Sequence, residues 1–231
     1  MHEVFANRAE AGRELADRLA EFDGQPGVLV LGLPRGGVPV AFEVAAALGL
    51  PLDVFTARKL GVPGHEELAL GAVASGDVCV INDQIAAAFA VSAEELARRV
   101  RATGEDVRVH DLRYRGARPP VDVQGSIAIL VDDGIATGAT VRAAVTALRT
   151  RGARHIVVAS PVASPDSVVP IKRIADDVVV LRLPARFMTV GAWYRDFPQL
   201  EDAEVRALLE QAAERLPEQF RHASHRHAHS G

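Results

Sequence analysis

The chain has 231 residues, of which 48% are hydrophobic and 24% charged, and its formal net charge at pH 7 is −4. This size and composition predict a globular protein with one substantial core, and no apolar stretch approaches the length of a membrane span. The small negative charge argues against a broad nucleic-acid-binding surface, and the single cysteine, Cys79, excludes disulfides within the chain and is expected to be a buried thiol.

The N-terminal residues 1–22 have the pattern of a charged amphipathic helix without a secretory apolar core, which predicts a cytoplasmic protein. A buried strand is expected over 28–31, followed by a glycine-rich turn and a helix over 38–48. In that turn Arg35 offers a planar fork of donors that matches phosphate geometry. Gly36 and Gly37 allow close backbone approach and positive φ. The alternative is an ordinary strand-to-helix turn with a surface arginine.

A third strand is expected over 52–57, with the cations Arg58 and Lys59 at its end. Taken alone, this pair is best interpreted as a solvated surface pair. A phosphorylated substrate, however, needs several cations and N–H donors around one pocket, and three strand ends could supply them together. Residues 61–67 are rich in turn formers and charge, which predicts a mobile loop.

The most informative segment is 127–140. Residues 127–131 are the apolar, β-branched run of a buried parallel strand, so Asp132 and Asp133 lie at its carboxyl end. Ligands bind at that edge of open α/β sheets, and we expect both carboxylates to be exposed there. A helix is predicted from about residue 139 to 150.

The loop between this strand and its helix combines small residues with two hydroxyl donors. Its backbone N–H groups could close around phosphate oxygens at the start of a helix, where the dipole favours an anion. The loop residues are Ala136, Thr137, Gly138, Ala139 and Thr140. The carboxylates Asp132 and Asp133 would accept hydrogen bonds from vicinal hydroxyls and could hold a hydrated Mg²⁺. The alternative is that these residues are only turn and cap residues.

Strand and helix patterns continue to alternate, with strands over 155–159 and 178–181 and a short helix over 164–174. This alternation predicts an α/β fold with a doubly wound parallel sheet. We expect one domain over 1–215 and a disordered, histidine-rich tail over 216–231.

Residues 132–140 closely resemble the ribose-5-phosphate signature of the type I phosphoribosyltransferases. The Arg35-Gly36-Gly37 turn resembles the pyrophosphate loop of that family, and Arg58-Lys59 resembles its pyrophosphate-binding pair in the purine branch. The resemblance implies a Mg²⁺-dependent transferase that moves the 5-phosphoribosyl group of 5-phosphoribosyl 1-pyrophosphate (PRPP) to a nitrogenous acceptor such as a nucleobase. It is also compatible with a homodimer. It also implies a strained or cis peptide, most readily Pro34–Arg35.

The resemblance further implies a small hood over the site, which we place within 185–200. This segment contains Trp193, Tyr194 and Phe197 in a chain poor in aromatic residues, and such rings can stack on a flat heterocycle. Core packing or a dimer interface is an equally strong interpretation. Hypoxanthine-guanine enzymes carry an aspartate where this chain has Ala136, so neither the base nor a catalytic base is assigned.

An alternative function is a regulatory protein that keeps the pocket as a PRPP sensor and binds nucleic acid or a protein partner. Retention of Arg35 and Arg58-Lys59 favours the enzyme, with PRPP and an acceptor as its partners and no role for nucleic acid or membrane.

Overall fold

The computed structural model describes residues 4–116, 118 and 120–215, so the predicted disordered tail lies outside the described residues. Its main sheet has five strands in the order β2-β1-β6-β7-β8, and every neighbouring pair is parallel. The strands are β1 (Val28–Gly32), β2 (Leu52–Val54), β6 (Ile127–Val131), β7 (His155–Val162) and β8 (Asp177–Arg182).

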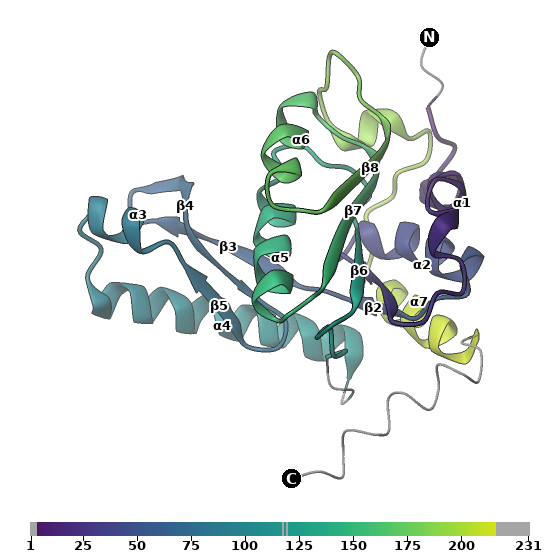
Figure 1. Ribbon diagram of the computed structural model, residues 1–231. Helices are drawn as coiled ribbons and strands as arrows, with labels where there is room; N and C mark the ends of the chain where they lie inside the picture. The colour runs from purple at the N-terminus through teal and green to yellow at the C-terminus, as the bar shows by residue number, and fades with distance from the viewer. Residues whose placement is uncertain (1–3, 117, 119, 216–231) are drawn as a thin grey trace.

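Helices cover both faces of this sheet, as a doubly wound fold requires (Figure 1). On one face lie α1 (Arg8–Asp17) and α2 (Gly37–Ala47), and on the other lie α5 (Ala139–Thr150) and α6 (Pro165–Lys172). Each face of the sheet has its own apolar core, and strand β6 contributes to both. Ile129 and Val131 pack in the core with α1 and α2, while Ala128 and Leu130 pack in the core with α5 and α6. Alternate side chains of a strand point to opposite faces, so a continuous apolar run serves two layers.

A second, antiparallel sheet forms an arm that extends away from the main sheet (Figure 1). Its strands, in the order β3-β4-β5, are followed by two helices. These elements are β3 (Ala57–Val62), β4 (His65–Ala74), β5 (Val78–Ile81), α3 (Asp83–Ala88) and α4 (Ala93–Arg115). The base of the arm packs against α5, so the arm shares one apolar core with the main sheet.

The arm overturns four predictions. Strand β2 ends at Val54, and the expected mobile loop over 61–67 is the tip of the β3–β4 hairpin, which turns at Gly64 with φ +77°. Arg58 and Lys59 lie inside β3 rather than at a strand end. Cys79 in the edge strand β5 is exposed rather than buried.

The chain ends its described part with the short helix η2 (Val190–Trp193) and with α7 (Asp202–Arg215), while another short helix, η1 (Ala20–Phe22), follows α1. Helix α7 packs against α2 and α4. Within the described residues, no helix combines the length and the apolar character needed to cross a bilayer.

Candidate functional site

The two glycine-containing turns emerge side by side because their strands are neighbours. Strands β1 and β6 pair in register, with Gly32 opposite Val131, and the Leu33 amide donates to the Val131 carbonyl at 2.9 Å. The turn 33–36 and the loop 132–138 therefore share one part of the carboxyl edge, as predicted.

Gly36 and Gly37 are required because the turn lies very close to Asp133 and to the end of β6. A Cβ on Gly36 would lie 2.0 Å from Oδ2 of Asp133, and one on Gly37 would lie 2.5 Å from the Val131 carbonyl oxygen. Of the two properties that glycine allows, the turn uses close approach and not positive φ, since Gly36 has φ −63°. The Pro34–Arg35 peptide bond is cis, as expected.

Asp133 is buried, which contradicts the expectation of an exposed carboxylate. Its Oδ2 accepts a hydrogen bond from Nε of Arg8 at 2.8 Å, within an ion pair whose side chains are 10% and 13% exposed. The N-terminal helix and the segment 193–198 fold over the strand end, and the sequence pattern around residue 133 carries no sign of either. Burial raises the pKa of Asp133, and the hydrogen bond from Arg8 opposes this shift.

Asp132 is only partly exposed, and its Oδ1 accepts a hydrogen bond from the Asp133 amide at 3.0 Å. Burial and the neighbouring carboxylate of Asp133 raise the pKa of Asp132 well above its usual range. One oxygen of each carboxylate is thus engaged within the protein. The second oxygen of each carboxylate is a hard acceptor.

The predicted phosphate loop lies directly after these carboxylates. Gly138 has φ +69° and precedes α5, which begins at Ala139, and Oγ1 of Thr137 accepts a hydrogen bond from the Ala139 amide at 3.4 Å. Ala136, Thr137 and Thr140 are exposed. The loop therefore presents the first turn of a twelve-residue helix to solvent, which is favourable for an anion.

The predicted pyrophosphate cations lie close to acidic residues of two helices. Nη1 of Arg35 is 3.9 Å from Oδ1 of Asp202 in α7, and Nε of Arg58 is 3.5 Å from Oδ2 of Asp106 in α4. Lys59 follows Arg58 in the same strand, so their side chains start on opposite faces of the arm sheet. The structure does not present them as one pair at a strand end.

Tyr114 joins these groups, because its hydroxyl lies 3.3 Å from Oδ1 of Asp202. Burial and the charge of Asp202 raise the pKa of Tyr114 to about 12, and Arg35 and Arg58 oppose this shift. Sequence reasoning missed Tyr114, Asp202 and Asp106, since no motif marks them in α4 and α7.

The residues of the aromatic segment differ in their surroundings, and the sequence left open whether they stack on a heterocycle or pack in the core. Tyr194 is buried and stacks with Phe197 at 5.0 Å, and its hydroxyl donates to the Asp133 carbonyl at 2.6 Å. These two rings belong to a core with Phe5. Trp193 is half-buried beside that core, and Val190 in the same short helix covers Gly134.

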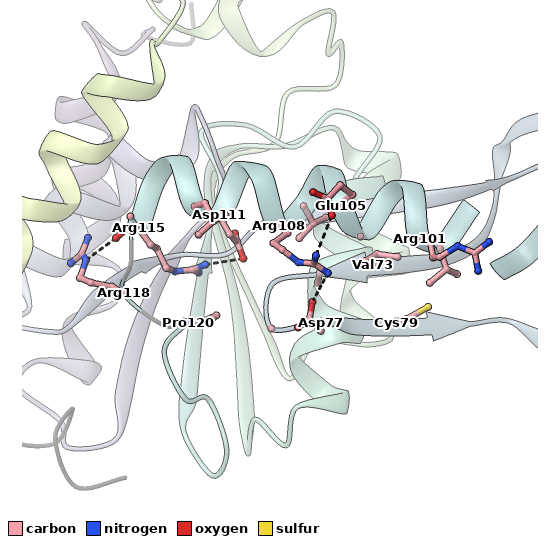
Figure 2. A pocket seen from close by; sticks show the side chains of 17 residues that line it. Val73, Asp77, Cys79, Arg101, Glu105, Arg108, Asp111, Arg115, Arg118 and Pro120 are labelled. Atoms are coloured by element: carbon pink, nitrogen blue, oxygen red, sulfur yellow. Dashed lines mark hydrogen bonds and ion pairs between the residues drawn. The ribbon is translucent and has the colours of Figure 1, made fainter. Parts of the chain in front are cut away.

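A cavity of about 550 Å³ lies elsewhere, between α4 and the strands β4 and β5. Figure 2 shows Arg108 of α4 between Glu105 of the same helix and Asp77, which follows β4. Arg108 is 3.8 Å from Asp77 and 3.1 Å from Glu105. None of the predicted site residues lines the cavity. The candidate site is therefore the carboxyl edge of the main sheet, where the predicted turns meet.

Residues 2–185 match the family model described as the phosphoribosyl transferase domain. The chain belongs to the phosphoribosyltransferase family. It is 46% identical over 209 residues to "Putative phosphoribosyl transferase MT0597" of Mycobacterium tuberculosis strain CDC 1551 / Oshkosh, and equally to Rv0571c of strain ATCC 25618 / H37Rv. These alignments cover 90% of this chain and 47% of each relative, so the chain spans about half the length of the curated relatives it matches.

The fold of this chain is similar to that of a solved protein. The crystal structure of TT1426 from Thermus thermophilus superposes with a TM-score of 0.83 at 43% identity, covering 90% of this chain and 98% of that chain. The family resemblance and the α/β fold with a parallel central sheet are confirmed.

Proposed function

We propose that this phosphoribosyltransferase transfers the 5-phosphoribosyl group of PRPP to a nitrogenous acceptor, with a nucleobase as the acceptor class, and releases pyrophosphate. The observation that carries the proposal is the meeting of two turns at the ends of β1 and β6. One turn contains Arg35-Gly36-Gly37, and the other contains two carboxylates followed by a small hydroxyl-bearing loop at a helix start.

Each part of the site has a proposed role in this reaction. Asp132 and Asp133 hold the ribose hydroxyls and stabilise the positive charge that develops on the ring. Residues 136–140 bind the 5′-phosphate through backbone N–H groups and hydroxyls. Arg35, the two glycines after it and Arg58 bind the pyrophosphate. The bond from C1 to the pyrophosphate oxygen breaks, the leaving group keeps the electron pair, and the acceptor nitrogen bonds to C1 and loses its proton.

The residues present fit Mg²⁺ as a proposed cofactor. Two adjacent carboxylates each have one oxygen not engaged by Arg8 or by the backbone bond described above, and oxygen is the ligand that this cation prefers. In the described part of the chain, no cluster of three or more ligating side chains exists, so Asp132 and Asp133 would share the ion with water and substrate oxygens. When bound, Mg²⁺ would neutralise charge on the leaving group.

Pyrophosphate release from PRPP, measured across a panel of nucleobases with Mg²⁺, tests this proposal. We expect release with at least one base and its loss when a chelator removes the metal. PRPP binding detected by calorimetry, without release for any acceptor, would instead support the regulatory sensor and contradict the enzyme.

The half-buried Trp193 gives a separate prediction about the acceptor. If its ring forms a wall for a planar base, Trp193→Ala should lower kcat/KM for the acceptor by about two- to tenfold, while Trp193→Phe retains most of it. Affinity for PRPP should change less, since the indole ring carries no positive charge with which to hold a phosphate. An equal loss of donor affinity, or dissociation of an oligomer with unchanged kinetics, would assign Trp193 to the core or an interface.

A further inference from the structure

We propose that Arg8 is a positioning residue for Asp133 and that Tyr194 supports it, so that the N-terminal helix and the aromatic segment fix the orientation of a reacting carboxylate. This inference rests on the proposed function, because it concerns how Asp133 performs the role assigned to it there.

Arg8 holds the side chain of Asp133 from one side. Its Nε donates to Oδ2 of Asp133 at 2.8 Å, and its Nη1 donates to the Pro198 carbonyl at 2.9 Å. Its guanidinium carbon also lies 3.8 Å from the centre of the Phe197 ring. Three independent contacts therefore fix the guanidinium plane, and a planar donor fork transmits that orientation to the carboxylate.

Tyr194 holds the backbone of the same residue. Its hydroxyl donates to the Asp133 carbonyl at 2.6 Å, and its ring lies between Phe5 at 5.5 Å and Phe197 at 5.0 Å. Backbone hydrogen bonds join this segment to the N-terminus, from the Phe5 amide to the Trp193 carbonyl at 2.9 Å and from the Arg195 amide to the Phe5 carbonyl at 2.8 Å. The two clamping elements thus form one unit.

This unit determines which carboxylate oxygen can face a substrate. Oδ2 of Asp133 lies between Arg8 and the backbone of Gly36, where a Cβ would be only 2.0 Å away. Oδ1 is the oxygen not held by Arg8, so the clamp selects it for the ribose. Orientation of this kind contributes most where charge develops in the transition state, because small displacements there reduce the rate strongly.

The experiment compares Arg8→Ala, Arg8→Lys and Tyr194→Phe with the wild type in pyrophosphate release from PRPP. Arg182→Ala is the matched control, since Arg182 lies 3.5 Å over the Phe5 ring of the same aromatic core and pairs with Glu14 at 3.4 Å. We expect Arg8→Ala to lower kcat at least about tenfold with KM for PRPP changed less than about threefold. Added guanidinium should restore part of the loss, and Arg182→Ala should keep kcat near that of the wild type.

Arg8→Lys keeps the charge but loses the fork, so we expect a lower kcat, and Tyr194→Phe should lower kcat while keeping the ring contacts. These two variants decide the question if Arg8→Ala does not fold. Two results would overturn this inference alone, provided that the wild type is active. The first is an unchanged kcat in both Arg8→Lys and Tyr194→Phe. The second is a loss of kcat in Arg8→Ala that guanidinium does not relieve and that Arg182→Ala shows to the same extent. A wild type that releases no pyrophosphate overturns the proposed function, and this inference with it.

Discussion

Asp132→Asn is expected to reduce kcat/KM for pyrophosphate release by about 10²–10³-fold, the size seen when one preorganised electrostatic group is removed. In the same variant the melting temperature should rise. Asp132 is partly buried beside a second carboxylate, and burial together with Asp133 raises its pKa well above the usual range. The ionised side chain therefore opposes folding, and a neutral isostere removes that cost.

Asp133→Asn should lose activity to a similar degree but should raise the melting temperature less than Asp132→Asn does. Burial raises the pKa of Asp133, so a neutral amide relieves a cost, but the change also leaves the buried guanidinium of Arg8 without its counter-charge, and this loss offsets the gain.

Thermal unfolding by calorimetry and steady-state kinetics on the same two preparations test both changes. The difference between the two shifts in melting temperature shows which of the two carboxylates also forms a stabilising ion pair. If both variants unfolded cooperatively at the wild-type temperature with full activity, the assignment of these acids to ribose would be wrong.

The parts of the fold that could be predicted depend on short, contiguous signals. Strand β6 and helix α5 begin and end at the predicted residues, because an apolar run and a glycine-marked helix start are local features. The alternation of strands and helices likewise predicts the parallel sheet, whose crossovers impose that order.

The arm could not be predicted in the same way. Strand β3 carries Arg58 and Lys59 and pairs with β4 across a charged hairpin tip, so its pattern resembles a loop with adjacent cations. A small antiparallel sheet stabilised by α4 and α5 depends on tertiary contacts, which override local propensity.

The surroundings of the candidate site could not be predicted either, because they too depend on contacts between residues far apart in the sequence. Arg8 and Asp133 are separated by 125 positions, and Arg35 and Asp202 approach each other only because α7 packs back against α2. No spacing in the sequence indicates that Arg8 is buried against a carboxylate.

Gly36→Ala is expected to reduce both the stability and the activity of the protein. The new Cβ would lie 2.0 Å from Oδ2 and 2.4 Å from Cγ of Asp133, whose side chain is held by Arg8 and cannot easily move away. The strain should cost about 1–3 kcal/mol of stability, or about 2–12 °C in melting temperature for a chain of this size. Displacing the turn and the carboxylate together should lower kcat/KM by about 10²-fold.

Gly104→Ala provides the matched control for this prediction. Gly104 lies inside α4, and a Cβ there would meet only Val73 at 3.9 Å. Alanine in a helix interior is favoured over glycine by roughly 0.5–1 kcal/mol, so this variant should be slightly more stable and fully active. Calorimetry and pyrophosphate release distinguish the two outcomes. A Cβ 2.0 Å from Oδ2 of Asp133 must displace either the turn or the carboxylate. Wild-type kinetics in Gly36→Ala would therefore show that the turn and Asp133 do not act together on one substrate.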